Sequence, residues 1–534
     1  MPIYKIPYRE TGYFSRLICD FLDENKQVKP FYHRFQKLGD FKAQIDEKSS
    51  FSDVNRKVLV EVLKRQYTKL DASETLAHIE LLANANTFTV TTGHQLNLFT
   101  GPLYFLYKII DTVTLSRKLK AQYPECDFVP VYWMATEDHD FDEINHFRLH
   151  GKNFAWNKTG VEDNDKGAVG HFDTEGLKAV YEQFCAELGS TDRAKTLCEL
   201  FENAYLKHDN LAEATRYLAH QLFGKYGLVI IDADNHDLKK LFIPQMKAEL
   251  TANDSHEVVT ASTQKLEEAG YNSQVHPREI NLFYLDNELR ERIVKQDGKY
   301  FVNTTQLEFT EEELLTELEN APEKFSPNVI MRPLYQEVIL PNLCYIGGGG
   351  ELAYWLQLKA NFGRAEVPFP ILMLRNSVLL ITEKQFAKAE KLGISIKDMF
   401  LPQNDLVNQK IRKISNIDID FTEQKEHLVK QFEEMYAIAE QTDKSFLGAV
   451  KAQEVKQLKG LDHLEKRLLK AQKRKLGDHV KRMTDLQNEL FPSSNLQERV
   501  MNFSEFYMEY GEDLIPMLLD NLDPLEDGFT VMVV

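Results

Sequence analysis

Acidic and imidazole side chains are concentrated in one short segment of the sequence. An apolar run at residues 128–136 is followed directly by Glu137, Asp138, His139, Asp140, Asp142, Glu143 and His146. Crowded carboxylates repel one another, so they stay ionised only beside a cation, an amine or hydrogen-bond donors. An amine substrate would meet this need, with Asp138 or His139 as the group that orients it and takes its proton. The simpler alternative is a charged loop.

The same segment could in principle bind a metal. Asp138, His139 and His146 are all common ligand types, but their spacing matches no sharp motif such as HExxH. We therefore predict no metal site in this chain.

A first glycine-containing turn lies near residue 93. Thr92 is followed by Gly93, His94 and Gln95, and Gly101 with a proline comes shortly after. A glycine at such a turn lets backbone N–H groups approach a phosphate or carboxylate, and His94 could donate a proton to developing negative charge. A tight turn with a surface histidine explains the pattern equally well.

A second glycine-containing turn precedes a helical segment. Its residues are Gly347, Gly348, Gly349, Gly350 and Glu351, and the helical segment behind them contains Trp355. A helix N-terminus attracts anions, and consecutive glycines permit close backbone approach to a ligand, which is the interpretation that we prefer over a flexible loop.

Other polar residues could line a pocket. Gln274, His276 and Arg278 lie in a proline-containing segment, although loop polarity alone explains them almost as well. Arg332 could pair with a carboxylate in bidentate fashion, or could be structural because it precedes a proline. The phosphate-binding motif GxxxxGK[ST] is absent from the sequence.

Alternating apolar runs and amphipathic segments position these residues. Strand-like runs at 87–95, 128–136 and 227–234 and a helical pattern at 103–120 predict an α/β fold with a Rossmann-type parallel sheet. Apolar runs at 329–341 and 367–381 could complete that sheet. Ligands bind beyond the carboxyl ends of such strands, which is where the acidic segment and the first glycine turn would lie.

The sequence divides into core and connecting segments. We assign 1–150 to the first part of the core, 151–225 to an inserted connecting segment, 226–256 to a continuation of the core, 257–325 to a second connecting segment and 326–419 to core completion. Residues 420–490 are predicted to form a helical coiled coil, and 491–534 a C-terminal helical segment.

The coiled-coil prediction rests on seven-residue spacing. Apolar residues recur at this spacing in two stretches, which are Phe421, Leu428 and Met435, and then Leu469, Leu476, Met483 and Leu490. This pattern predicts an antiparallel helical hairpin or packing against a second copy, and hence a homodimer. Residues 451–482 contain eleven Lys or Arg and four Asp or Glu, which favours a solvated face over a phosphate contact.

Composition excludes several classes of protein. The 534 residues are 43% hydrophobic and 27% charged, as in a globular protein, and the net charge of −18 disfavours general attraction to nucleic acid or anionic membranes. No apolar stretch reaches the roughly 18 residues that a membrane span requires. The five cysteines are widely spaced without a CxxC pair, so we expect no disulfide framework or zinc site, and a cytoplasmic location.

Four sequence blocks together resemble the BshC family of bacillithiol biosynthesis, the cysteine ligases. The blocks are TGHQLNLFTGPLYFLYK, VYWMATEDHDFDEINHF, IGGGGELAYWLQLK and NLQERVMNF, and the resemblance covers essentially the whole chain. It implies a Rossmann-type core related in layout to class I aminoacyl-tRNA synthetases, inserted connecting modules and a coiled coil that supports dimerisation. It also implies the last step of bacillithiol synthesis, which joins cysteine to glucosaminyl malate.

Carried onto this chain, the resemblance places the family's functional turns at 93–95, 137–140 and 347–351. Because amide formation from a free carboxylate is unfavourable in water, we expect ATP or another nucleotide as activating donor, with Mg²⁺ only as its companion. A metal-assisted hydrolase and a non-catalytic coiled-coil scaffold remain the alternatives.

Overall fold

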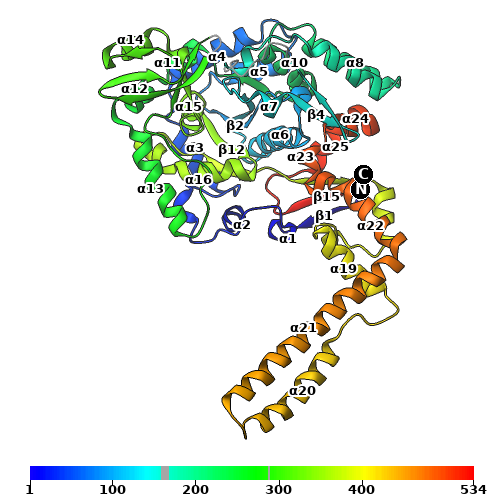
Figure 1. Ribbon diagram of the computed structural model, residues 1–534. Helices are drawn as coiled ribbons and strands as arrows, with labels where there is room; N and C mark the ends of the chain where they lie inside the picture. The colour runs from blue at the N-terminus through cyan, green and yellow to red at the C-terminus, as the bar shows by residue number, and fades with distance from the viewer. Residues whose placement is uncertain (158–166, 287–288) are drawn as a thin grey trace.

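The computed structural model describes residues 1–157, 167–286 and 289–534. Figure 1 shows a large α/β body from which a helical hairpin projects. The two predicted connecting segments contain residues 158–166 and 287–288, which lie outside the described residues.

A parallel sheet lies at the centre of the body. Its strand order is β13-β12-β2-β3-β6, with bounds β2 Thr87–His94, β3 Asp127–Met134, β6 Val229–Asp232, β12 Asn342–Gly347 and β13 Ile371–Leu374. These strands are almost wholly buried, which is why they appear in the sequence as continuous apolar or β-branched runs. The predicted Rossmann-type core is confirmed.

Helices cover this sheet. α6 (Tyr104–Gln122) packs on β2 and β3, and α3 (Asp40–Lys48) packs on β12. The other helices before β2 are α1 (Tyr8–Thr11), α2 (Arg16–Leu22), α4 (Asp53–Gln66) and α5 (Ser73–Leu81). Between β3 and β6 the chain forms α7 (Phe141–Ile144), the hairpin of β4 (His146–Leu149) and β5 (Lys152–Ala155), α8 (Leu177–Leu188), α9 (Asp192–Tyr205) and α10 (Leu211–Phe223).

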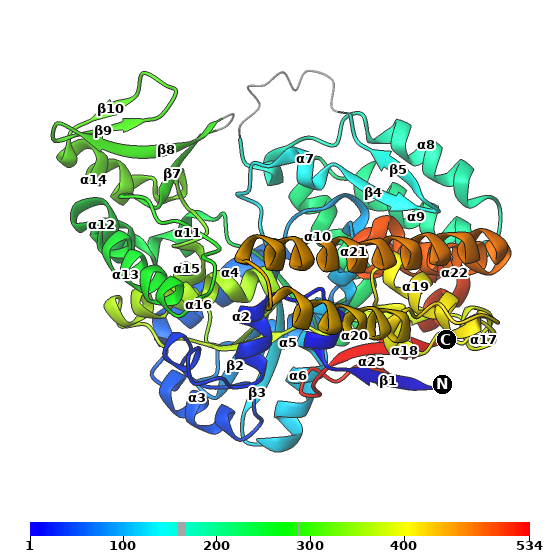
Figure 2. The ribbon, with the colours of Figure 1, turned by 60° about the horizontal axis from the view of Figure 1, so that its bottom comes forward.

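A second, antiparallel sheet lies between β6 and β12 in the sequence. Its order is β10-β9-β8-β7-β11, with bounds β7 Leu282–Asp286, β8 Leu289–Gln296, β9 Lys299–Val302, β10 Glu308–Phe309 and β11 Phe325–Pro327. The helices of this region are α11 (His236–Lys240), α12 (Ile243–Ala252), α13 (Asp254–Glu268) and α14 (Glu311–Asn320). In Figure 2 this inserted sheet stands at the upper left of the body.

Of the two apolar runs expected to complete the central sheet, residues 367–381 supply β13 to it, whereas residues 329–341 form no strand. Residues 329–341 contain helix α15 (Arg332–Ile339), which begins with Pro333 in its first turn, a position where the missing N–H costs nothing. β14 (Val378–Ile381) belongs to a third sheet of order β1-β15-β14, with β1 at Ile3–Ile6 and β15 at Phe529–Val533. Buried apolar runs look alike in sequence whether they form a helix or strands of different sheets, so the pattern alone does not distinguish α15 and β14 from strands of the central sheet.

The projecting hairpin consists of α20 (Thr422–Ala439) and the first part of α21 (Lys444–Lys475), which run side by side in both views. Phe432 and Ala439 of α20 pack against Val450 of α21. The second predicted heptad stretch does not form this pair. It continues into α22 (Gly477–Leu490), where Met483 and Leu490 are buried in the main core.

The remaining C-terminal elements pack on the body. They are α16 (Gly349–Arg364) after β12, then α17 (Glu383–Lys391), α18 (Ile396–Met399), α19 (Gln403–Ile414), α23 (Gln497–Val500), α24 (Phe503–Tyr510) and α25 (Leu514–Asn521). Cys185 of α8 and Cys198 of α9 form a disulfide, a pairing that the widely spaced cysteines of the sequence did not indicate. They are 13 residues apart, and the packing of the two helices against each other brings them together. None of the described helices is both long and apolar enough to cross a membrane.

Candidate active site

One cavity of about 720 Å³ opens at the carboxyl ends of the central strands. Its walls come from the turns after β2, β3 and β12, from the inserted sheet, and from segments 274–282 and 327–332. The predicted site residues that line it are Gly93, His94, Gln95, Glu137, Asp138, His139, Gln274, His276, Arg278, Arg332, Gly348, Gly349, Gly350 and Glu351. Segments that are distant in sequence therefore meet where a Rossmann-type fold binds its ligands.

The carboxylate of Asp138 is held in place but remains accessible. The Gln95 side-chain amide donates to Asp138 Oδ2 over 2.8 Å and also to Glu143. Asp138 Oδ1 accepts the backbone N–H of His139 over 2.8 Å. The side chain keeps 28% of its surface exposed. Asp138 is therefore oriented by neutral donors and free to accept a proton from a ligand.

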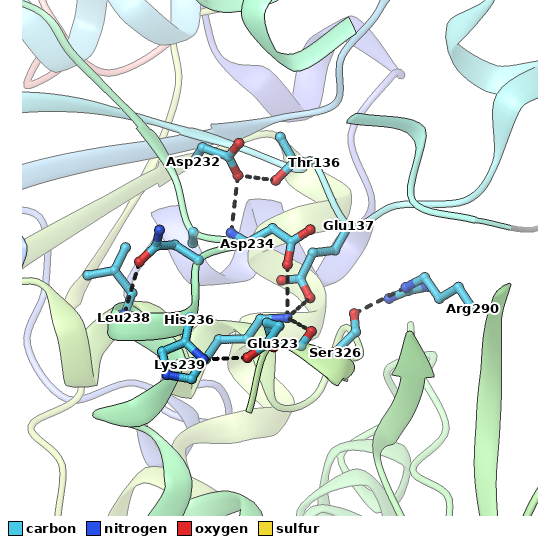
Figure 3. Close-up of polar contacts among 12 residues, drawn as sticks. Thr136, Glu137, Asp232, Asp234, His236, Leu238, Lys239, Arg290, Glu323 and Ser326 are labelled. Carbon is cyan, nitrogen blue, oxygen red and sulfur yellow. Dashed lines mark hydrogen bonds and ion pairs between the residues drawn. The ribbon is translucent and has the colours of Figure 1, made fainter. Parts of the chain in front are cut away.

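Its neighbour Glu137 is enclosed in a buried charge cluster (Figure 3). Lys239 Nζ, which is fully buried, lies 2.6 Å from Glu137 Oε1 and 3.2 Å from Asp234 Oδ1, and it donates to the Glu323 carbonyl. Burial disfavours the ammonium, but the two carboxylates raise the pKa of Lys239. Burial raises the pKa of Glu137, and Lys239 opposes this shift. Glu137 thus fixes the wall of the cavity through Lys239.

The same cluster fixes the end of β6. Asp234 also pairs with His171 Nε2 over 2.8 Å, and the Thr136 hydroxyl donates to Asp232 over 2.6 Å. Although burial opposes ionisation of Asp234, Lys239 and His171 lower its pKa to about 2. These contacts tie the carboxyl ends of β3 and β6 together.

His139 interacts with the inserted sheet. Arg290 of β8 places Nη1 2.7 Å from His139 Nδ1 and donates from Nε to the Ser326 hydroxyl. Burial and the Arg290 charge lower the pKa of His139. The imidazole is 45% exposed on the cavity wall.

The turn before α16 carries its own anion. Glu351 accepts the Gly348 N–H over 2.8 Å and the Tyr345 hydroxyl over 2.7 Å, and it pairs with buried Lys108. Although burial opposes ionisation, Lys108 lowers the pKa of Glu351. The Glu351 carboxylate therefore satisfies part of the helix N-terminus that was expected to bind a ligand anion, while the backbone of 348–350 still lines the cavity.

His94 is almost completely buried. Burial and nearby Lys108 lower its pKa well below the usual value. Its ring packs against Tyr104 and Phe105, and Nε2 has no hydrogen-bond partner among the described residues. His94 is therefore neutral at neutral pH, so it can offer a hydrogen bond but no charge.

Basic side chains are more numerous than carboxylates around the cavity, despite the net negative charge of the chain. They are Lys108, Arg278, Arg290, Arg292, Arg332, Arg375 and Arg499. Arg375 is buried beside Gly348 and pairs with Glu498, and its Nε has no hydrogen-bond partner among the described residues. This cavity is suited to an anionic ligand.

Some predicted residues lie outside this cavity. Asp140 caps α7 by accepting the Glu143 N–H. Gly101 and His146 line a second, smaller cavity. Gly347 ends β12, and Trp355 is buried against the Tyr345 ring. Asp138, His139 and His146 thus do not gather around one point, and the described residues contain no group of three or more His, Cys, Asp or Glu placed to hold a metal ion.

Sequence reasoning missed several lining residues. Lys108 is a charged residue among the apolar positions of the predicted helix at 103–120, and Arg375 directly follows β13, so both carried a usable signal. Arg290, Arg292 and Arg499 come from segments with no pattern that links them to the central sheet.

Comparisons with known proteins agree along the whole chain. Residues 1–376 match the family model "Bacillithiol biosynthesis BshC, N-terminal Rossmann-like domain", and residues 378–534 match the corresponding C-terminal coiled-coil domain. A relative from Christiangramia forsetii is 60% identical over 100% of this chain and 99% of its own. One from Flavobacterium johnsoniae is 58% identical over 100% of both chains. Both carry the name "Putative cysteine ligase BshC".

A solved structure described as a "putative arginyl t-RNA synthetase" from Campylobacter jejuni is 10% identical, and the match covers 80% of this chain and 99% of that one with a TM-score of 0.21.

Proposed function

The chain belongs to the BshC family of bacillithiol biosynthesis, and from this premise we propose that it is a ligase that joins the carboxyl group of L-cysteine to the amine of glucosaminyl malate. The observation that carries the proposal is the convergence of an accessible carboxylate, Asp138, with arginines and a glycine turn in one cavity. A carboxylate suits an amine substrate, and the arginines suit the malate carboxylates.

Asp138 is the general base of this reaction. The sugar amine must lose a proton as its nitrogen bonds to the cysteinyl carbonyl carbon, and the Asp138 carboxylate accepts that proton. Gln95 orients the carboxylate through its amide N–H without changing its charge. Glu137 does not compete for this role, because Lys239 holds it as part of the wall.

A nucleotide is the expected source of activation for the cysteine carboxyl group. The chain's residues fit its phosphates, since Arg375 has a buried Nε without a partner among the described residues and lies beside Gly348 at the start of α16. When bound, the nucleotide would make the carboxyl oxygen a leaving group. Arg332 and Arg375 are the residues that we expect to hold it.

Replacement of Asp138 with Asn tests the proposal. The amide keeps the size of the side chain but cannot take the amine proton, so we expect kcat for cysteine-dependent ligation of glucosaminyl malate to fall by about 10²–10⁴-fold. Asp142 follows on the same segment and does not line the cavity, so Asp142→Asn is the matched control. Full activity of a folded Asp138→Asn variant would remove Asp138 from the mechanism, and lack of ligation by the wild-type chain with ATP and with other nucleoside triphosphates would contradict the function.

A further inference from the structure

Arg290 joins the inserted sheet to the acidic turn of the central sheet. Arg290 is 8% exposed, and its guanidinium lies 4.1 Å from the centre of the Phe283 ring and donates from Nε to the Ser326 hydroxyl. Nη1 lies 2.7 Å from His139 Nδ1. Phe283 and Ser326 thus fix the direction in which Nη1 of Arg290 offers an N–H to His139.

This contact determines which nitrogen of His139 carries the proton. An arginine can only donate hydrogen bonds, so Nδ1 of His139 must be the acceptor. The proton of the neutral ring then resides on Nε2, because the hydrogen bond made by one ring nitrogen sets the state of the other. A ring in this form offers an N–H on one side and has its only lone-pair acceptor occupied on the other.

The charged form of His139 is disfavoured by the same geometry. A second proton at Nδ1 would face the Arg290 N–H directly, and burial adds to this cost, so the pKa of His139 is lowered. The carboxylates of Asp138, Asp140 and Glu291 act in the opposite direction and do not overcome these two effects. His139 therefore stays neutral at physiological pH.

We propose that Arg290 is a positioning residue that holds His139 as an Nε2–H donor, and that His139 stabilises the acyl oxygen of cysteine during amide formation. This inference rests on the proposed function. The amine nitrogen bonds to the carbonyl carbon, its proton passes to Asp138, and negative charge develops on the acyl oxygen until the bond to the activated carboxyl oxygen breaks. His139 donates a hydrogen bond to that oxygen and transfers no proton.

The adjacency of the two residues supports this division of roles. The amine nitrogen and the acyl oxygen are attached to the same carbon during the attack, so the base and the donor must lie next to each other. Asp138 and His139 are consecutive residues on one turn, and both line the cavity. Assigning the base to His139 instead would require a free lone pair, which Arg290 occupies.

Substitutions of His139 distinguish a role as hydrogen-bond donor from a role as general base. Gln places an N–H close to the position of Nε2, whereas Glu has a similar shape but offers a carboxylate. With cysteine, glucosaminyl malate and ATP, we expect His139→Gln to keep kcat within about tenfold of the wild type and His139→Glu to lose about 10²–10³-fold, the usual cost of a lost oxyanion donor. A Glu variant at least as active as the Gln variant would overturn the proposal.

The role of Arg290 is tested by a double-substitution cycle. Arg290→Met should lower kcat in the wild-type background, and Arg290→Lys, which keeps a donor, should restore part of it. In the His139→Gln background the Met substitution should have little further effect, because Gln has no tautomer to fix. An equal loss in both backgrounds would show that Arg290 only supports the fold and would overturn its positioning role.

Nuclear magnetic resonance gives a readout that does not depend on activity. In the full chain labelled with ¹⁵N-histidine, and with His139→Gln used for assignment, we expect the His139 signals to show a protonated Nε2 and an unprotonated Nδ1 at pH 7. In Arg290→Met the His139 ring should become a mixture of its two neutral tautomers, and its pKa should rise. A protonated Nδ1 in the wild type would overturn the inference even if ligation is observed. The expected tautomer in a chain that ligates nothing would instead contradict the proposed function alone.

Discussion

Neighbouring carboxylates of the acidic turn have different surroundings and hence different roles. Glu137 is enclosed by Lys239, whereas Asp138 is held by Gln95 and remains accessible. The sequence shows both as equivalent members of one charged segment. Lys239 lies 102 residues from Glu137, so no local pattern relates them.

Replacement of Lys239 with Met should strongly destabilise the protein. The substitution leaves Glu137 and Asp234 buried near each other without a cation, and breaking a buried ion pair in this way costs about 3–5 kcal/mol. Chemical denaturation measures the free energy of unfolding. Lys240→Met is the matched control, since Lys240 is exposed and should tolerate the change. A similar free energy for both variants would show that the cluster carries no net charge–charge stabilisation.

Asp111 makes the free energy of unfolding depend on pH, and substitution of this one residue isolates its contribution. It is fully buried in α6 and accepts hydrogen bonds from the backbone and side chain of Asn376, and burial raises its pKa to about 7. A raised folded-state pKa means that the stabilisation is complete below the unfolded pKa, about 4, and is lost as the pH rises through 7.

We therefore expect the stability of the wild type, relative to Asp111→Asn, to fall between pH 4 and pH 7 by about 1.4 kcal/mol for each pH unit. Urea denaturation of both chains at several pH values measures this difference. Asp527→Asn, at an exposed position, should show no such trend. A difference that rises with pH would contradict the assigned direction.

At the scale of elements, the hairpin of α20 and α21 buries only part of its apolar surface. Phe432, Ala439 and Val450 form its small core, while Met435 and Ile438 of α20 are 45% and 61% exposed. Met435 belongs to the heptad pattern of the sequence, so its exposure leaves an apolar position without a partner in one chain. We propose that a second copy of this chain covers the hairpin.

The double variant Met435→Glu, Ile438→Glu tests this homodimer. The two positions are three residues apart and share one helix face, so the added charges should oppose association without disturbing the buried side. Light scattering after size exclusion should give twice the chain mass of 61.9 kDa for the wild type and the single mass for the variant. The control variant Gln424→Glu, Gln431→Glu adds the same charge at exposed polar positions of α20 and should remain dimeric. A monomeric wild type would contradict the proposal.

At the scale of the whole molecule, the two ends of the chain close one sheet. β15 lies between β1, to which it is antiparallel, and β14, to which it is parallel. Every residue of β15 is buried. The C-terminal strand is therefore part of the folded body and not an appendage of the helical region that precedes it.

Val531→Pro should destabilise the molecule by about 3 kcal/mol or more. Val531 pairs with Tyr4 on one side and Leu379 on the other, and proline removes a backbone N–H and cannot fit a central strand. Thermal denaturation is the measurement, with Asp527→Ala in the exposed turn before the strand as control. An unchanged melting temperature for Val531→Pro would mean that the terminal sheet contributes little to stability.

The sequence by itself determined the central strands β2, β3 and β6, the turns that follow β2, β3 and β12, and the first helix of the projecting hairpin. Each leaves a local pattern, namely a buried apolar run, a break at glycine or acid residues, or a seven-residue spacing. Because parallel strands align their carboxyl ends, the meeting of Gly93, Asp138 and Gly350 in one cavity could be expected from these patterns.

Only the tertiary structure decided which groups face one another within that cavity. Lys239 at Glu137 and Arg290 at His139 come from segments 102 and 151 residues away. It also decided that β14 leaves the central sheet to pair with β15. Such contacts depend on how whole layers of the fold pack together. A residue whose partner is distant along the chain shows no periodic pattern in its own segment that would reveal the contact.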